Sequence, residues 1–294
     1  MTISSKRLYI TILACFLLAA NIQAQLLYAI SGNNAEAKSY ILATNRLCDI
    51  TFLDSIPNLF KVYGRCNKII TEMALYDFET TNALKQAALL PDSLSLQQEY
   101  TPEELQTIDN GLRTNLNLSI DKVGRMKPSY LTELYRNELL TKWLNYDPNR
   151  SSEVFFQTVA ATTYTPIYAL DDVGETLYML FDREPFQWQC KELLSIIEYP
   201  EREIRLEKNL LEAYKMGQLT QIAYDIQAPD NRSTHSYSDY TVYCQRNKEW
   251  VKRLKTYLAE GNAFICLDAV YLGGEKGLLA QLRAVGYKVK PVNK

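Results

Sequence analysis

Acidic and phenolic side chains stand at the ends of two strand-like apolar segments. Glu72 closes one segment, and Asp268, Tyr271 and Glu275 follow the other. Carboxylates act as general acids and bases, and oxygen-only sites suit Mn²⁺, Mg²⁺ or Ca²⁺. A tyrosine hydroxyl can donate a proton or stabilise an oxyanion. These residue types would suit hydrolysis of a peptide or a related bond.

Histidine is scarce. The chain contains one, His235, in the polar segment Asn231–Ser236, without a partner histidine. A lone histidine in a polar loop is more often solvated than a metal ligand. No CxxC or Cys/His spacing indicates zinc. The sequence therefore predicts no histidine-based metal site.

The segment 262–294 predicts a strand, a glycine loop, a helix and a second strand. Residues 264–267 are apolar, glycines interrupt the loop at 273–277, and apolar residues then recur at helical spacing. Gly286 is typical of a left-handed helix cap, and a half-buried strand pattern follows it. We expect two parallel strands joined by a right-handed crossover, with the loop at the carboxyl edge of the sheet.

The beginning of the chain repeats this order. The segments Leu26–Ser31 and Ser39–Thr44 flank a Gly/Asn turn and predict a hairpin. An amphipathic stretch at 56–63 and the strand Lys68–Met73 follow. A weak internal repeat therefore brackets the chain.

Helices dominate the middle. Thr101 followed by Pro102 predicts a helix start, and an apolar stripe from Leu131 to Leu144 predicts a buried helix face. The strand 163–170 ends in Asp171 and Asp172, to which we assign a helix-capping role, with a part in a polar site as the alternative. A long helix is expected from Tyr240 to Glu260.

These elements predict an α/β fold with a central mixed β-sheet flanked by helices, with strand-loop-helix-strand units at both ends of the chain. No Pro/Gly/Ser-rich linker divides the chain. About 270 residues after a leader are enough for one large core. We expect a single domain at 25–294 with a helical insertion at about 77–150.

The first 24 residues are typical of a signal peptide. Lys6 and Arg7 precede the uncharged run Leu8–Ala20, and Ala24 offers a small residue for cleavage. The run is shorter than the roughly 20 residues that span a bilayer. We expect a periplasmic or secreted bacterial protein without an integral membrane span after cleavage. Lipoprotein anchoring at Cys15 is the less favoured alternative.

Charge and cysteine content set further limits. Loss of Lys6 and Arg7 would change the net charge from −2 to −4. This balance predicts neither nucleic-acid nor anionic-membrane binding. Five cysteines would remain, so at least one thiol would be free, while Cys48 and Cys66 could pair.

The glycine loop also carries a family resemblance. The segment from Asp268 to Leu278 resembles the closing motif of the TraB/GumN family, Gly-Ala-x-His-Leu-x-Gly-x-x-Gly-Leu, with Tyr271 at the histidine and Asp268 at the first glycine. This family includes the Tiki-type metal-dependent proteases. The resemblance implies its erythromycin esterase-like architecture.

Other segments resemble the family in the same order. Thr44, Asn45 and Arg46 stand where the family has Gly-Thr-x-His, so Arg46 holds the histidine position, and Glu72 matches a glutamate that ends a later strand. Residues 245–250 resemble Glu-Arg-Asn-x-x-Trp. The resemblance implies that Arg246 and the adjoining asparagine reach the site; helix-surface packing is the alternative.

Both family histidines are therefore replaced. Arginine is a permanent cation without a lone pair, so Arg46 opposes a metal ion. We predict that Arg46 pairs with Glu72 and Asp268 instead; exposure of these side chains to solvent is the alternative. The catalytic candidates are Glu72, Arg246 and Tyr271. The predicted cleft is lined by Thr44, Asn45, Arg46, Asn247, Asp268, Gly273, Gly274 and Glu275.

Two functions follow from this pattern. The first is an exported, catalytically inactive relative that needs no cofactor and binds a peptide or an envelope protein. The second is a metal-dependent peptidase or hydrolase with a site rebuilt from Glu72, Asp268 and Glu275, using Mn²⁺ or another divalent cation. The charge of Arg46 favours the first.

Overall fold

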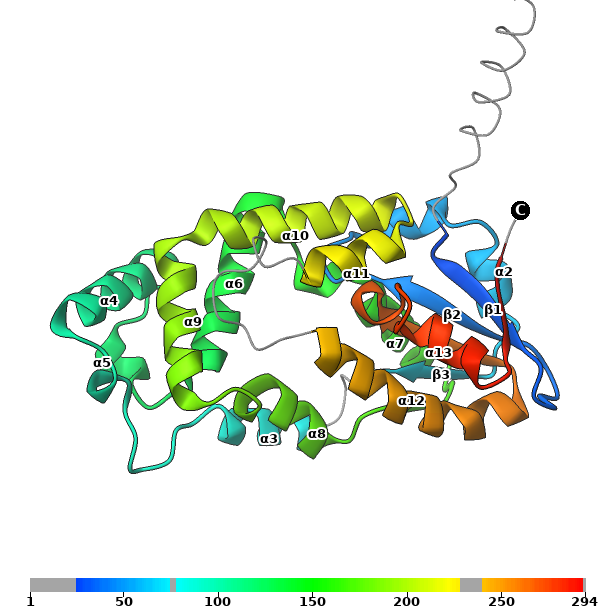
Figure 1. Ribbon diagram of the computed structural model, residues 1–294, viewed down its shortest axis with the longest axis horizontal. Helices are drawn as coiled ribbons and strands as arrows, with labels where there is room; N and C mark the ends of the chain where they lie inside the picture. Colours follow the sequence, from blue (N-terminus) through cyan, green and yellow to red (C-terminus); the bar gives the residue numbers. More distant parts are fainter. Residues whose placement is uncertain (1–24, 75–77, 228–239, 293–294) are drawn as a thin grey trace, which may run out of the picture.

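A computed structural model describes residues 25–74, 78–227 and 240–292 of the chain (Figure 1). The predicted signal peptide at 1–24, with Cys15, lies outside these residues, and so does His235. Within the described part of the chain, no helix is both long enough and apolar enough to cross a bilayer.

The described residues form a mixed six-stranded sheet with the order β4-β3-β5-β2-β1-β6. Its strands are β1 (Leu27–Ser31), β2 (Ser39–Thr44), β3 (Lys68–Thr71), β4 (Ile167–Ala169), β5 (Ala263–Asp268) and β6 (Lys288–Pro291). Strand β5 pairs in parallel with β2 and β3, and β3 pairs in parallel with β4. The predicted α/β fold with a mixed sheet is confirmed.

The predicted hairpin is present, but the last strand lies elsewhere than expected. Strands β1 and β2 pair antiparallel, with Leu27 opposite Leu42. Strand β6 has the direction of β5, as predicted, yet it pairs antiparallel with β1 at the far edge of the sheet. The hairpin already fills the place beside β5. Lys288 and Lys290 are exposed on β6, and such charges protect a sheet edge from further pairing.

The helices surround the sheet and extend beyond it. The α-helices are α2 (Leu59–Tyr63), α3 (Phe78–Ala87), α4 (Pro102–Leu116), α5 (Ile120–Val123), α6 (Pro128–Leu144), α7 (Ser152–Thr162), α8 (Val173–Leu177), α9 (Phe186–Glu198), α10 (Pro200–Lys215), α11 (Leu219–Gln227), α12 (Tyr240–Glu260) and α13 (Leu278–Ala284). Short 3-10 turns are η1 (Ile50–Ser55), η2 (Leu96–Gln98), η3 (Pro148–Arg150) and η6 (Ala269–Tyr271), and η4 (Tyr178–Asp182) is a π-helix.

Local signals set several helix ends where they were expected. Thr101 and Glu104 form a reciprocal capping box at the start of α4. Gly286 follows α13 with φ +99°, a conformation that favours glycine. The amphipathic stretch predicted at 56–63 is helical only in α2, and η1 precedes it. The strand expected at 163–170 is restricted to β4.

Two large apolar cores support the described part of the fold. The larger core lies on the sheet and includes Phe264, Leu267 and Trp250. The smaller core joins α4, α5, α6 and α9, which we call the helical lobe, and contains Leu131 of α6 and Leu193 of α9. The lobe therefore extends beyond the insertion predicted from the sequence. Figure 1 shows the lobe at one end of the molecule and the sheet at the other.

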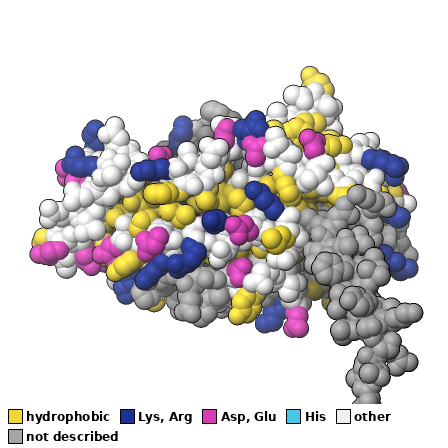
Figure 2. Space-filling model, turned by 90° about the horizontal axis from the view of Figure 1, so that it is seen from above, with side chains coloured by type: hydrophobic (Ala, Val, Ile, Leu, Met, Phe, Trp, Pro, Cys, Tyr) yellow, Lys and Arg dark blue, Asp and Glu magenta, His cyan; other side chains and the backbone are white. Residues whose placement is uncertain are grey.

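The surface is not uniformly polar. Figure 2 shows a band of apolar side chains across one face, with acidic and basic side chains beside it. Large exposed apolar side chains in the described residues include Trp143, Met216 and Tyr224, which are 62%, 56% and 66% exposed. Trp143 was expected on the buried stripe of α6, but it lies one residue before the helix ends.

The cysteines of the described residues are free thiols, Cys48 and Cys66 included.

Candidate functional site

The parallel strands bring polar side chains to one edge of the sheet. Thr44 ends β2 opposite Asp268 at the end of β5. Glu72 follows β3, and Asp171 follows β4. The backbone N–H of Asp268 donates to Oε1 of Glu72 at 3.0 Å. Because parallel strands share a carboxyl edge, four side chains distant in the sequence meet there.

Arg246 of α12 occupies the middle of this edge. Its Nη1 lies 3.2 Å from Oε2 of Glu72, and its Nε donates to Oδ2 of Asp171 at 2.7 Å. Nη1 also donates to the hydroxyl oxygen of Tyr271. The structure thus brings Glu72, Arg246 and Tyr271 together, and it adds Asp171.

Aromatic rings and amide groups hold Arg246 in place. Its guanidinium lies 4.5 Å from the ring centre of Trp250 and 4.9 Å from that of Tyr271. Trp250, one helical turn away on α12, also donates its indole N–H to Asp171. Asn247 donates to the backbone carbonyl of Tyr271 at 2.8 Å and is 1% exposed. Both residues of the Arg-Asn pair therefore face the site rather than the helix surface.

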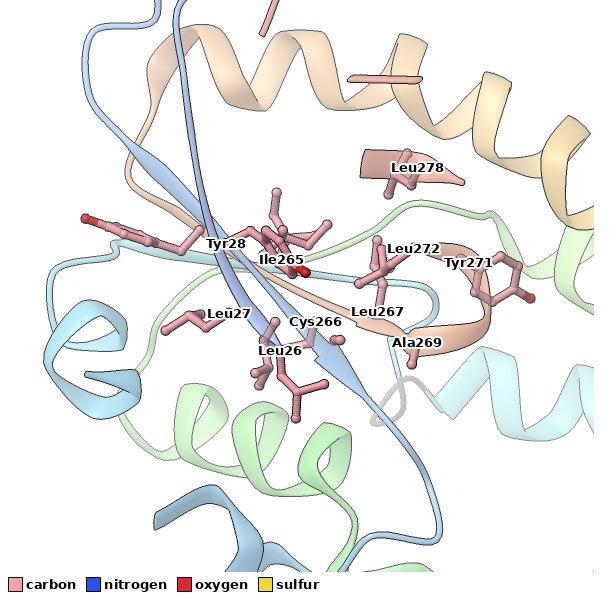
Figure 3. Close-up of a cluster of buried hydrophobic side chains, with 14 of the residues drawn as sticks. Leu26, Leu27, Tyr28, Ile265, Cys266, Leu267, Ala269, Tyr271, Leu272 and Leu278 are labelled. Atoms are coloured by element: carbon pink, nitrogen blue, oxygen red, sulfur yellow. The ribbon is translucent and has the colours of Figure 1, made fainter. Parts of the chain in front are cut away.

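Tyr271 lies where the apolar core meets this polar network. Figure 3 shows it at the margin of the cluster formed by Leu267, Ala269 and Leu272. Burial raises the pKa of Tyr271 well above its ordinary value, and the charge of Glu72 adds to this effect, while Arg246 opposes it. Its hydroxyl therefore remains protonated at neutral pH and can still donate a hydrogen bond while it accepts one from Arg246.

Three carboxyl groups at this edge influence one another. Thr44 donates its hydroxyl hydrogen bond to Glu153, in the first turn of α7. Burial raises the pKa of Glu153 to about 7; the hydrogen bond from Thr44 opposes this shift, and the charge of Glu72 adds to it. Burial, followed by the charges of Glu153 and Glu72, also raises the pKa of Asp268 well above its ordinary value. The protonation state of each of these acids therefore depends on that of the other two.

Glu153 was missing from the residues predicted for the site. An acid in the first turn of a helix is common because it complements the helix dipole, so its position indicated nothing more. The assignment of Asp171 was also wrong. Asp172 and Glu175 form the capping box of α8, whereas Asp171 is 7% exposed and binds Arg246.

Arg46 does not have the partners that we predicted. Its Nη2 lies 3.1 Å from Oε1 of Glu207 on α10, and its Nη1 lies 3.7 Å from Oε2 of Glu133 on α6. Glu72 is instead held by Arg246. The prediction that Arg46 pairs with Glu72 is therefore wrong, because a second guanidinium already neutralises that carboxylate.

The remaining predicted residues have local structural roles. The side-chain oxygen of Asn45 accepts from the backbone N–H of Leu47 at 2.9 Å and fixes the turn after β2. A Cβ at Gly273 would come within 1.9 Å of the carbonyl oxygen of Leu219, so glycine permits close packing on α11. Gly274 has φ +80°, and Glu275 is exposed.

These side chains do not fit a divalent cation at Glu72. Oε1 of Glu72 accepts from the backbone of Asp268, and Oε2 faces the guanidinium of Arg246. The carboxylate of Asp171 accepts from Arg246 and Trp250. A fixed positive charge lies among the oxygens that would have to bind a cation. In the described ranges, no three His, Cys, Asp or Glu side chains are grouped as metal ligands.

The family comparison covers this whole arrangement. The model of the TraB/PrgY/gumN family matches residues 26–291. No curated protein and no solved structure matches the chain.

Proposed function

Because the chain belongs to the TraB/PrgY/gumN family, we propose that it uses the family scaffold as a binding protein without metal-dependent protease activity. The observation that carries this proposal is the position of Arg246. Its guanidinium contacts Glu72, Asp171 and Tyr271. A cation at this edge would have to displace an internal cation that is already neutralised and hydrogen-bonded.

The residues at the two family histidine positions support the same conclusion. Arg46 has no lone pair, and Tyr271 is a buried phenol whose oxygen already accepts a hydrogen bond. A hard divalent cation would need that phenol to ionise, and burial opposes ionisation. Neither side chain therefore replaces an imidazole as a metal ligand.

The proposed ligand is a peptide or a protein of the cell envelope, met after export. The apolar band of Figure 2 supports this proposal, because a contiguous exposed apolar surface is typical of interaction sites.

Restoration of the histidines tests the proposal. We expect the wild-type chain to bind no stoichiometric Mn²⁺ or Co²⁺ in calorimetric titration. A variant that combines Arg46→His and Tyr271→His with Arg246→Gln, which also removes the guanidinium from Glu72, should gain binding. The matched control is Arg150→His/Tyr164→His, which places two histidines at exposed positions. One equivalent of metal bound by the wild type, with peptide turnover lost in Glu72→Ala, would contradict the proposal.

A second function is favoured by Glu153. A carboxyl group with a pKa of about 7 beside the Thr44 hydroxyl has the proton affinity of a general acid or base at neutral pH. The chain would then be a hydrolase with a rebuilt carboxylate site. Peptide turnover that is lost in Glu153→Gln, measured with and without Mn²⁺, would select this function.

A further inference from the structure

A second network of charges, partly buried, lies between the sheet and the helical lobe. Glu133 of α6 contacts both Arg46, at 3.7 Å, and Arg136. Arg136 also lies 2.5 Å from Glu203 of α10 and 3.4 Å from Glu192 of α9. Arg46 completes the network through Glu207. We call these six side chains the lobe cluster.

The lobe cluster spans a boundary between two cores. Arg46 follows β2, and its neighbours Leu42 and Cys48 belong to the core on the sheet. Glu133 lies between Leu131 and Tyr135, which belong to the core of the helical lobe. The ion pairs of Arg46 therefore connect units that bury their apolar side chains separately, and such boundaries are where relative motion is expected.

Helix α10 takes part in both units. Leu210 and Tyr214, toward its C-terminal end, are buried in the sheet core. Glu203 and Glu207, toward its N-terminal end, face the two arginines of the lobe cluster. The contacts of Arg46 with α6 and α10 therefore lie where the lobe leaves the sheet.

The charges of the lobe cluster are unequal. Four carboxylates face two guanidinium groups, and only Arg46 comes from the sheet unit. Burial raises the pKa values of Glu192 and Glu207, with the neighbouring carboxylates adding to the shift and the arginines opposing it. Burial acts in the same direction on Glu133, but Arg136 and Arg46 together hold its pKa below the ordinary value. Loss of either arginine would leave strong repulsion among the remaining acids.

We propose that the lobe cluster is a clasp that holds the helical lobe against the carboxyl edge of the sheet, with Arg46 as the residue that fastens it. Removal of the positive charge from Arg46 releases α6 and α10 from the loop after β2. Opening of the lobe then gives a ligand access to the edge that carries Glu72 and Tyr271. This role does not depend on whether the edge is catalytic.

Hydrogen-deuterium exchange of the full chain tests the clasp. In Arg46→Gln we expect roughly tenfold faster exchange in residues 45–48 and in the segment of α6 around Glu133, because local opening becomes easier. Exchange in β5 and α13 should not change. Arg46→Lys keeps the positive charge but loses the two parallel N–H donors of the guanidinium. Its exchange rate should therefore lie between those of the wild type and Arg46→Gln.

A double variant that also neutralises Glu207 distinguishes the loss of a clasp from a simple loss of packing. Arg46→Gln/Glu207→Gln removes one of the acids that repel each other, so we expect its exchange to return toward the wild-type rate. A packing defect would instead become worse. The matched control is Arg150→Gln, which breaks an exposed ion pair with Asp49 and should leave the lobe unchanged.

Two results would overturn the clasp. One is exchange in Arg46→Gln within about twofold of the wild type in α6, since a clasp must slow opening. The other is faster exchange that is equal in α6, β5 and α13, which would indicate global destabilisation. If Arg46→Gln does not fold, Arg46→Lys gives the same comparison, and unchanged α6 exchange in that variant would reject the clasp.

Discussion

Arg246 and Arg46 lie at the same edge of the sheet in different surroundings. The side chain of Arg246 is 14% exposed, and its carboxylate partners follow strands of the sheet. Arg46 is 33% exposed, and its partners come from α6 and α10. The first arginine completes the edge of one core, whereas the second connects two. The position of an arginine in the chain therefore does not predict its role, which depends on the elements that supply its acids.

The largest expected effect is at Arg246. Arg246→Leu would leave Glu72 without its counter-charge and Asp171 with only the more distant Arg253, and removal of one partner from a buried pair costs roughly 3–5 kcal/mol. The free energy of unfolding, measured in urea, should fall by that amount. Arg253→Leu is the control, because Arg253 is more exposed and contacts Asp171 at 3.6 Å. Equal losses in the two variants would contradict the special position of Arg246.

A smaller loss is expected at Arg46. Arg46→Gln should lower the free energy of unfolding by roughly 1–2 kcal/mol, because partial exposure allows water to replace some of the lost contacts. The same urea measurement checks this prediction. A loss as large as that of Arg246→Leu would show that the two networks are equivalent.

The raised pKa of Glu153 should make the free energy of unfolding depend on pH. Its pKa in the folded chain, about 7, lies above the ordinary value, so its contribution to stability is complete below the ordinary pKa and is lost as the pH rises through about 7. Glu153→Gln cannot ionise, and its amide oxygen can still accept from Thr44. Relative to the wild type, this variant should gain on the order of 1–2 kcal/mol between pH 5 and pH 8. A difference that is independent of pH would contradict the shift.

The smallest effect concerns a single hydroxyl group. Tyr271→Phe removes the oxygen that accepts from Arg246 but keeps the ring that packs 4.6 Å from Trp250. Loss of one such hydrogen bond costs about 1 kcal/mol. Thermal unfolding should show a small decrease in midpoint, whereas Tyr164→Phe, at a side chain that is 94% exposed, should show none. A loss of stability larger than that of Arg46→Gln would mean that the Tyr271 hydroxyl contributes more than its hydrogen bond with Arg246.

Local patterns predicted most elements of the fold. The hairpin, β5, α13 and the long helix from Tyr240 to Glu260 depend on apolar periodicity and on residues such as Thr101 and Gly286, which act within a few positions. The pairing of β6 with β1 is set by which sheet edge is free, and no local pattern records that.

The sequence predicted only the part of the site that follows from the order and direction of the strands and from the family resemblance. Shared carboxyl edges bring Glu72 and Asp268 together, and the resemblance indicated Arg246 and Tyr271. The partners of Arg46 depend on how α6 and α10 pack over that edge, which is a property of the tertiary structure. Asp171 and Glu153 were hidden for a related reason, since each follows a pattern that a helix start explains equally well.

The central claim is that the guanidinium of Arg246, held by Glu72, Asp171 and Tyr271, excludes a divalent cation from Glu72. The six-line electron paramagnetic resonance signal of free Mn²⁺, recorded while the wild-type chain is added, tests it directly. The arrangement predicts that the signal keeps its full intensity. Loss of one equivalent of signal per chain, restored by Glu72→Ala, would contradict the claim.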